Sequence, residues 1–207
     1  MENNKIDHFF KVVIVGDMAT GKDSIIKKYV NNIFTAVYRQ SSGIDFGYKI
    51  LEWDDKNNVG LRLWSIAGRE KISEKKYIYY HDLDAVIIVC DITKKNNLES
   101  AKEWLNDIEQ YYGDFPIILL ANKCDVLSEC DVLSEDENIS TTNNFCEEHG
   151  ITAWFKTSAK DGTGINEAFE TLVEILLENE KLNKKKVIKA PLPKLIFREN
   201  RYTISSG

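Results

Sequence analysis

The chain has 207 residues, of which 43% are hydrophobic and 29% charged, a composition typical of one globular domain with a tail. The sequence lacks both the roughly 18-residue apolar run of a membrane span and the basic and apolar regions of a signal peptide, so we expect a cytoplasmic protein. The net charge is −6 although residues 181–207 carry eight Lys or Arg and one Glu, so the rest of the chain is strongly acidic, which argues against nucleic-acid binding.

Apolar runs and helical stretches alternate along the chain. A buried strand is predicted at 9–15, then a helix around 25–30, then two strands at 44–53 and 61–66 joined by the turn sequence DDKNN. Further strands are predicted at 85–90, 116–120 and 152–155, and further helices at 101–112, 141–149 and 165–176. This order predicts an α/β fold with a six-stranded, mostly parallel sheet and one antiparallel edge strand, whose ligands bind at the carboxyl ends of the strands.

A phosphate-binding loop follows the first strand. Its residues are Gly16, Asp17, Met18, Ala19, Thr20, Gly21 and Lys22, which match the pattern G-x-x-x-x-G-K and open a predicted helix. Backbone N–H groups of such a loop, the helix N-terminus and the lysine charge all favour phosphate oxygens. Asp23 and Ser24 follow, where the pattern has a Ser or Thr whose hydroxyl binds Mg²⁺.

Two further motifs follow later strands. They are Asn122-Lys123-Cys124-Asp125 and Ser158-Ala159-Lys160. With the phosphate loop they make the chain resemble the Ras-like GTPases, in which the Asp accepts hydrogen bonds from the guanine ring, the Ala N–H donates to its carbonyl, and the two lysines pack beside the base. The sequences SSGIDF at 41–46, Ile66-Ala67-Gly68 and AWFKTSAK make it most similar to the Rab family, near its branch of lysosome-related organelles.

The resemblance implies a Ras-like P-loop domain with five helices over residues 1–180 and a basic, disordered tail over 181–207. It implies GTP or GDP and Mg²⁺ as cofactors, and Phe34 beside the guanine. It also implies a monomer that binds effector proteins and exchange factors through an aromatic surface of Phe46, Trp64 and Tyr79.

Four positions depart from the family pattern. Arg69, which follows Gly68 at the catalytic position, replaces the Gln that orients the attacking water, and since Arg cannot accept a proton we expect very slow hydrolysis, unless Arg69 itself stabilises the transferring phosphoryl group. Asp23 replaces the metal-binding hydroxyl, Ser65 replaces the supporting Asp, and Ser41 replaces a Thr. Either Asp23 ligates Mg²⁺ and Ser65 hydrogen-bonds to it, or Asp23 repels the phosphates and weakens binding.

The C-terminal residues RYTISSG contain no cysteine, so no prenyl anchor is predicted. The basic tail favours a weak peripheral contact with anionic endomembranes. The leading hypothesis is therefore a Rab-like switch in membrane traffic with impaired GTP hydrolysis. The alternative is a pseudo-GTPase, which keeps the fold as a protein-interaction module without a nucleotide cycle.

Overall fold

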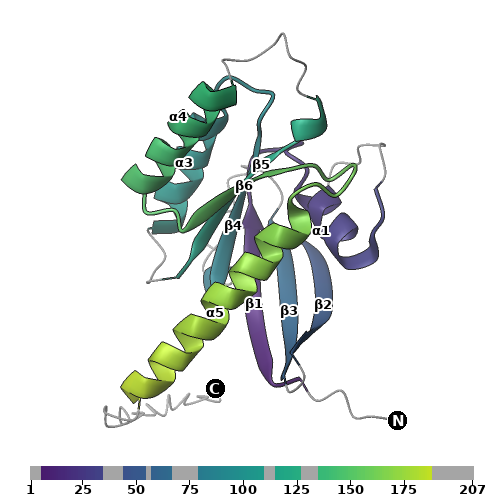
Figure 1. The fold of residues 1–207 in the computed structure, drawn as a ribbon, viewed down its shortest axis with the longest axis vertical. Coiled ribbons are helices and arrows are strands. Elements are labelled where there is room, and N and C mark those ends of the chain that lie inside the picture. Colours follow the sequence, from purple (N-terminus) through teal and green to yellow (C-terminus); the bar gives the residue numbers. More distant parts are fainter. Residues whose placement is uncertain are drawn as a thin grey trace, which may run out of the picture.

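Strands and helices alternate through the described part of the chain. The computed structural model describes residues 6–34, 44–54, 57–66, 79–109, 115–126 and 135–187. Its elements in chain order are β1 (His8–Val15), α1 (Lys22–Asn31), β2 (Ile44–Asp54), β3 (Asn57–Ile66), β4 (Ala85–Asp91), α3 (Asn97–Glu109), β5 (Ile117–Asn122), the 3-10 turn η1 (Cys124–Val126), α4 (Glu135–Glu148), β6 (Ala153–Thr157) and α5 (Ile165–Val187) (Figure 1). These residues contain four α-helices and η1, against the five helices expected.

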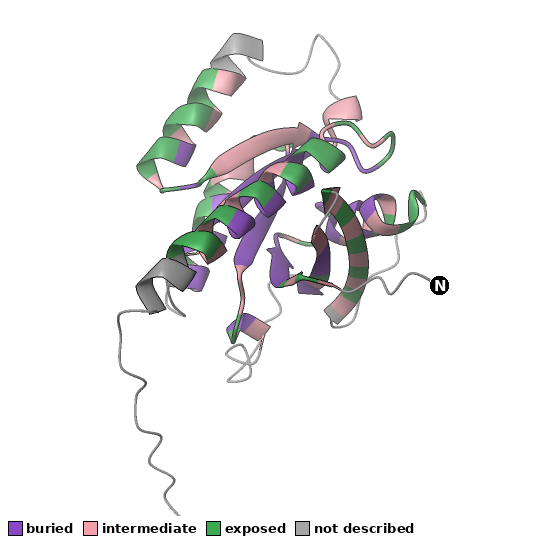
Figure 2. Cartoon of the chain, turned by 60° about the horizontal axis from the view of Figure 1, so that its bottom comes forward, coloured by how far each residue is buried: buried purple, intermediate pink, exposed green. Residues whose placement is uncertain are grey.

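The sheet has the predicted architecture. Its strand order is β2-β3-β1-β4-β5-β6, and every neighbouring pair is parallel except β2 and β3. Strands in the middle of such a sheet are covered on both faces, so their sequences are apolar without alternation. This explains why AVIIVC in β4 was recognisable as a strand: each of its residues is buried, as the purple central strands of Figure 2 illustrate.

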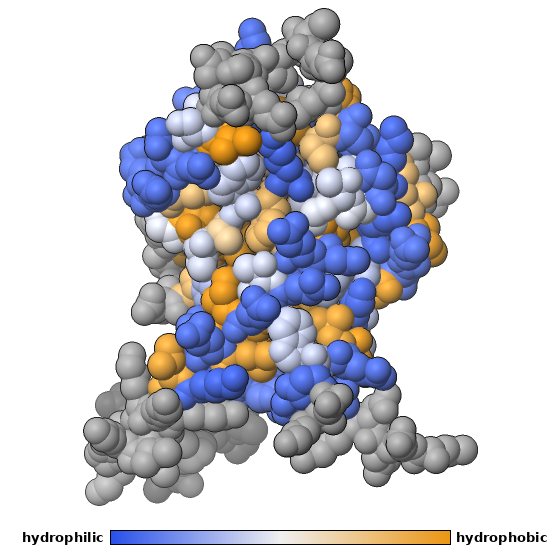
Figure 3. Space-filling model, viewed as in Figure 1, coloured by the Kyte–Doolittle hydropathy of each residue, from blue (hydrophilic) through white to orange (hydrophobic). Residues whose placement is uncertain are grey.

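Helices cover the two faces of the sheet in pairs. Val12 and Ile14 of β1 belong to the apolar cluster of α1 and α5, whereas Val13 and Val15 belong to the cluster on the other face, which contains residues of α3 and α4. The outer surface over α5 is mostly hydrophilic, with small separate apolar patches (Figure 3). The core is thus split into two layers by the sheet.

The hairpin of β2 and β3 has a shorter connection than DDKNN suggested. β3 begins at Asn57 rather than Leu61, and the ladder continues to the pair Asp54 and Asn57. The Asp54 carboxylate accepts hydrogen bonds from the backbone N–H and side-chain amide of Asn57, at 2.9 Å each through Oδ1. Polar residues typical of turns are here used to close the end of the ladder.

Several helices differ from their predicted bounds, and α3 begins at Asn97 rather than at residue 101. α4 begins at Glu135, earlier than the predicted 141. The sequence did not predict this start because residues 135–141 contain one apolar residue, Ile139, and therefore show no helical periodicity. α5 continues to Val187, past the expected domain boundary at residue 180. None of the helices in the described part of the chain combines the length and the apolar composition that a membrane span requires.

Candidate functional site

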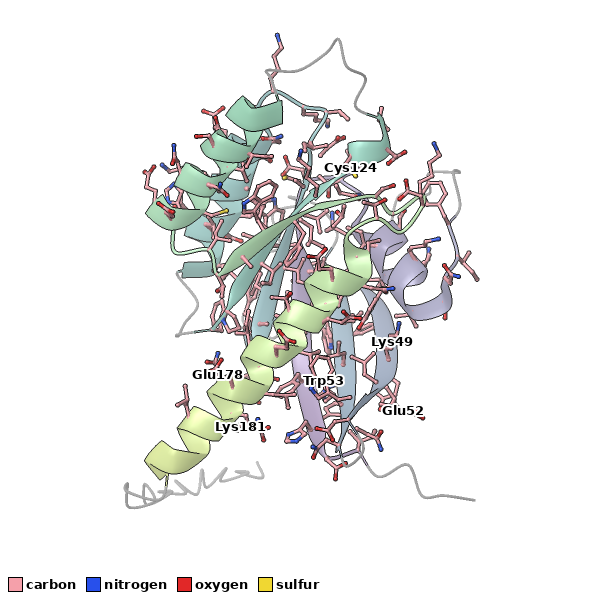
Figure 4. All side chains as sticks on the ribbon, viewed as in Figure 1. Lys49, Glu52, Trp53, Cys124, Glu178 and Lys181 are labelled. Atoms are coloured by element: carbon pink, nitrogen blue, oxygen red, sulfur yellow. The ribbon has the colours of Figure 1, made fainter. Side chains whose placement is uncertain are left out.

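The predicted motifs meet at one edge of the sheet. Gly16 follows β1, Asp91 ends β4, Asn122 ends β5 and Ser158 follows β6. Because β1, β4, β5 and β6 are all parallel, their carboxyl ends lie together. In Figure 4 this edge is marked by Cys124 in η1.

The phosphate loop has a backbone that demands glycine at both ends. Gly16 has φ +146° and a Cβ there would lie 2.2 Å from the carbonyl oxygen of Val89. Gly21 has φ +100°, and a Cβ there would lie 2.3 Å from Nδ2 of Asn122. The spacing of the two glycines is therefore a requirement of the curled loop as well as of a ligand.

Lys22 spans this loop from inside. Its Nζ donates to the carbonyl oxygens of Gly16 and Asp17 at 2.9 and 2.8 Å. Burial lowers the pKa of Lys22, against the opposing effect of the Asp23 and Asp17 charges. The loop tip, by contrast, is open: Met18 is exposed, and Ala19 adopts a left-handed conformation with φ +64°. Ser24 lies in the first turn of α1.

Asn122 joins three segments through one buried amide. Its Nδ2 donates to the carbonyl of Thr20 at 2.7 Å, which fixes the phosphate loop to the end of β5. Its Oδ1 accepts the backbone N–H of Ala159 at 3.1 Å and the hydroxyl of Thr157 at 3.3 Å. The phosphate loop and the Ser158–Lys160 loop therefore share one anchor.

Asp125 lies where the family resemblance requires a carboxylate for the guanine ring. Its side chain is 12% exposed, and Oδ1 accepts the Ser158 hydroxyl at 2.7 Å while Oδ2 lies 3.4 Å from Lys160 Nζ. The Ser158 oxygen also accepts the backbone N–H groups of Lys160 and Asp161. A loop held in this way keeps the carboxylate in a fixed direction before any ligand arrives.

Asp91 is a site residue that sequence reasoning missed. This carboxylate at the end of β4 is buried, and its Oδ2 lies 2.7 Å from Nζ of Lys123. Burial opposes its ionisation, but hydrogen bonds from Lys123 and Thr93 and the lysine charge outweigh that effect, so the pKa of Asp91 lies below its ordinary value. The available signal was an acidic residue closing a fully apolar strand.

A second missed contact anchors the phosphate loop to α3. The Asp17 carboxylate accepts hydrogen bonds from the Ser100 hydroxyl and, at 3.0 Å, from Trp104 Nε1. Asp17 and Trp104 are far apart in the chain, so the sequence does not predict their contact. The helical spacing predicts only that Trp104 lies on the apolar face of a helix. The loop is thus held on one side by α3 and on the other by Asn122.

Comparisons with known proteins agree with this geometry. The family model described as "Ras family" matches residues 11–178. The Ras-related protein Rab-32 of Sus scrofa is 39% identical over 178 residues, covering 84% of this chain and 76% of that protein. Rab-32A of Dictyostelium discoideum is 37% identical over 192 residues, with 87% and 86% covered, and human Rab-7L1 is 38% identical over 178 residues, with 84% and 85% covered. The chain belongs to the Rab group of the Ras family. The predicted placement near the branch of lysosome-related organelles is confirmed by the same relatives.

The predicted metal residues of this Rab-family chain are partly brought together. Ser65 Oγ donates to Asp23 Oδ1 over 2.7 Å, whereas Ser41 lies outside the described residues. Over the described ranges no group of three or more His, Cys, Asp or Glu side chains could hold a metal ion. One carboxylate and one hydroxyl nevertheless fit Mg²⁺, which accepts few protein ligands and completes its octahedron with nucleotide phosphates and water.

The aromatic surface expected of a Rab is formed in part. Phe46 of β2 is 60% exposed, and its ring meets Trp64 of β3 edge-on with centroids 4.6 Å apart. Trp64 and Tyr79 both pack against the cluster beneath α3, so part of each ring has a core role, and Lys11 Nζ lies 4.4 Å from the Trp64 ring centroid. Phe46 is the most exposed of the three rings, and Trp64 and Tyr79 are half-buried.

Of the remaining predicted site residues of this Rab, the structure describes Phe34. Phe34 is an exposed residue just after α1, whose C-terminus is closed by Asn32 at φ +55°. Gly68 and Arg69, the predicted catalytic positions, lie outside the described residues.

Proposed function

We propose that this chain is a guanine-nucleotide-binding switch of membrane traffic that hydrolyses GTP slowly and rests mainly in its GTP form. The observation that carries the proposal is the Asp125 carboxylate, which is nearly buried and fixed by Ser158 and Lys160 beside the phosphate loop. A carboxylate has more acceptor capacity than its contacts with Ser158 and Lys160 use, and guanine offers it two N–H donors. Adenine lacks that pair of donors, so the site favours guanine over adenine nucleotides.

The nucleotide cycle separates this function from the alternative of a pseudo-GTPase. Mass analysis of the nucleotide that co-purifies with the chain, followed by calorimetric titration with GDP, GTP and ATP, tests both. We expect a guanine nucleotide in the purified protein and preference for GDP and GTP over ATP. A chain that purifies empty and binds none of the three would instead be an interaction module.

Slow hydrolysis follows from Arg69. A glutamine at this position orients the attacking water by accepting a hydrogen bond from it, and a guanidinium has only donors. We expect Arg69→Gln to accelerate single-turnover GTP hydrolysis by roughly tenfold or more, since a positioned group of this kind contributes a factor of about 10² to 10⁴. Quenched-flow or slow-mixing assays of phosphate release measure the change.

Arg69→Ala is the matched control for this prediction. If Arg69 merely fails to orient water, its removal leaves hydrolysis equally slow. If alanine slows hydrolysis further, Arg69 is stabilising the transferring phosphoryl group from within the chain. A wild-type rate equal to that of Arg69→Gln would contradict the proposal of impaired hydrolysis.

We assign the effector and exchange-factor surface to the switch segments around 35–44 and 68–80, with Phe46, Trp64 and Tyr79 beside them. In a switch of this type the γ-phosphate orders those segments, which changes the surface offered to partners. The basic residues from Lys181 onward supply a weak attraction to anionic endomembranes, which co-sedimentation with anionic vesicles at low and high salt checks.

A further inference from the structure

Asp23 and Ser65 form a hydrogen-bonded pair where β3 ends beside the start of α1. Ser65 is 1% exposed and donates to Asp23 Oδ1 over 2.7 Å. β3 runs parallel to β1, with Ser65 paired to Ile14, so Ser65 lies at the same sheet edge as the phosphate loop. Asp23 stands in the first turn of α1, whose N-terminus faces that loop.

The chemistry of the pair is that of a Mg²⁺ site with its two groups in exchanged places. Phosphate-loop proteins hold Mg²⁺ with the hydroxyl of the residue after the loop lysine and with an acidic residue from another strand. Here the residue after Lys22 supplies the carboxylate and the strand supplies the hydroxyl. The number of oxygen atoms and the local charge are unchanged, and carboxylate is a preferred ligand of Mg²⁺.

The negative charges of Asp23 and of a bound nucleotide favour a cation at this site. Once a nucleotide is bound, the Asp23 carboxylate and the phosphates are like charges at close range, and Lys22 brings a single positive charge. A divalent cation held by Asp23 would offset this repulsion by its positive charge. Ser65 fixes the carboxylate from a buried position, so the ligand is oriented before the cation arrives.

We propose that Asp23 ligates Mg²⁺ directly and that Ser65 is a positioning residue that holds Asp23 toward it. This inference rests on the proposed binding of guanine nucleotides and specifies how that site holds its metal. It makes nucleotide retention strongly dependent on Mg²⁺, because without the cation Asp23 opposes the phosphates.

The direction in which Asp23→Asn changes the rate of nucleotide release distinguishes ligation of Mg²⁺ from repulsion of the phosphates. We would measure release of a fluorescent GDP analogue from the wild type and from Asp23→Asn, which has the same shape without the charge, with Mg²⁺ and with chelator. Asp23→Asn should speed release in Mg²⁺ by at least the roughly tenfold to hundredfold that the loss of a partner outside the ligand shell causes, and slow it in chelator. Slower release under both conditions would mean that Asp23 only repels the phosphates, and would overturn the proposal.

A double substitution provides the matched control. Asp23→Ser combined with Ser65→Asp restores the common arrangement, so it should recover Mg²⁺-dependent retention that Asp23→Ser alone loses. Electron paramagnetic resonance of Mn²⁺ added to each GDP complex measures the affinity of the metal site and does not depend on GTP hydrolysis. Ser65→Ala should weaken Mn²⁺ roughly tenfold to a hundredfold while leaving GDP release in chelator unchanged.

Failure of this inference and failure of the proposed function look different. GDP bound equally well by the wild type with Mg²⁺ and with chelator would overturn the metal site alone. A wild-type chain that binds no guanine nucleotide under either condition would overturn the proposed function, and the metal site with it.

Discussion

Asp125→Asn is expected to weaken GDP and GTP binding by about 10³-fold or more, as in sites built to hydrogen-bond one substrate and to reject an analogue. The carboxylate would accept two N–H groups of guanine, and an amide turned either way offers them at most one acceptor. The other contact becomes donor against donor in a pocket where the side chain is 12% exposed. An unpaired polar group in such surroundings is costly.

Calorimetric titration of the variant with GDP and with xanthosine diphosphate measures this change. Xanthine replaces the guanine amine by a carbonyl oxygen, which can accept from the new amide, so affinity for xanthosine diphosphate should rise. Asp161→Asn is the control, because Asp161 is an exposed carboxylate of the loop between β6 and α5 that accepts from Thr163. Unchanged GDP affinity in Asp125→Asn would contradict the assigned role of Asp125.

Phe169→Ala should lower the free energy of unfolding by about 3–5 kcal/mol, the usual cost of removing a large buried aromatic ring. Phe169 of α5 is fully buried, and its ring stacks on Tyr29 of α1 with centroids 3.8 Å apart and an interplanar angle of 8°. The ring fills the space where both helices meet the sheet, so its loss leaves a cavity between three elements. Urea unfolding followed by circular dichroism gives the free energy.

Tyr29→Phe is the control for this experiment. It keeps the stacked ring and removes a hydroxyl that is buried without a hydrogen-bond partner among the described residues, where burial raises its pKa. We expect a neutral effect or a gain of about 1 kcal/mol, because an unsatisfied buried hydroxyl is unfavourable. A Phe169→Ala chain as stable as the wild type would show that the stack contributes nothing to the core.

The sheet could be predicted from the sequence because its central strands are buried on both faces. β4 is a continuous apolar run and β1 is nearly one, and both strands of the hairpin were predicted from their alternation. Boundaries were harder at the hairpin, where specific polar contacts such as that of Asn57 with Asp54 leave no periodic signal. The start of α4 was missed because its sequence has too few apolar residues to show helical periodicity.

The candidate site also contains a part that could be predicted from the sequence and a part that could not. The motif residues of the phosphate loop and of the loops around Asp125 and Ser158 were predicted, and the structure brings them to one edge. The contacts from Asp91 to Lys123 and from Trp104 to Asp17 were not, since each joins residues far apart in the chain. The exchange of Asp23 and Ser65, with a hydrogen bond from Ser65, was a hypothesis from residue types, and the structure contains that hydrogen bond.

The Asn122 amide has a consequence for how affinity is distributed over a ligand. It bonds to the phosphate loop through Thr20 and to the base-side loop through Ala159, so a shift of either loop strains bonds to the other. Contributions from purine and phosphates are then coupled rather than additive, as for any two groups that share one anchor. A molecule carrying only half of the nucleotide would gain contacts in only one of the two loops that Asn122 joins.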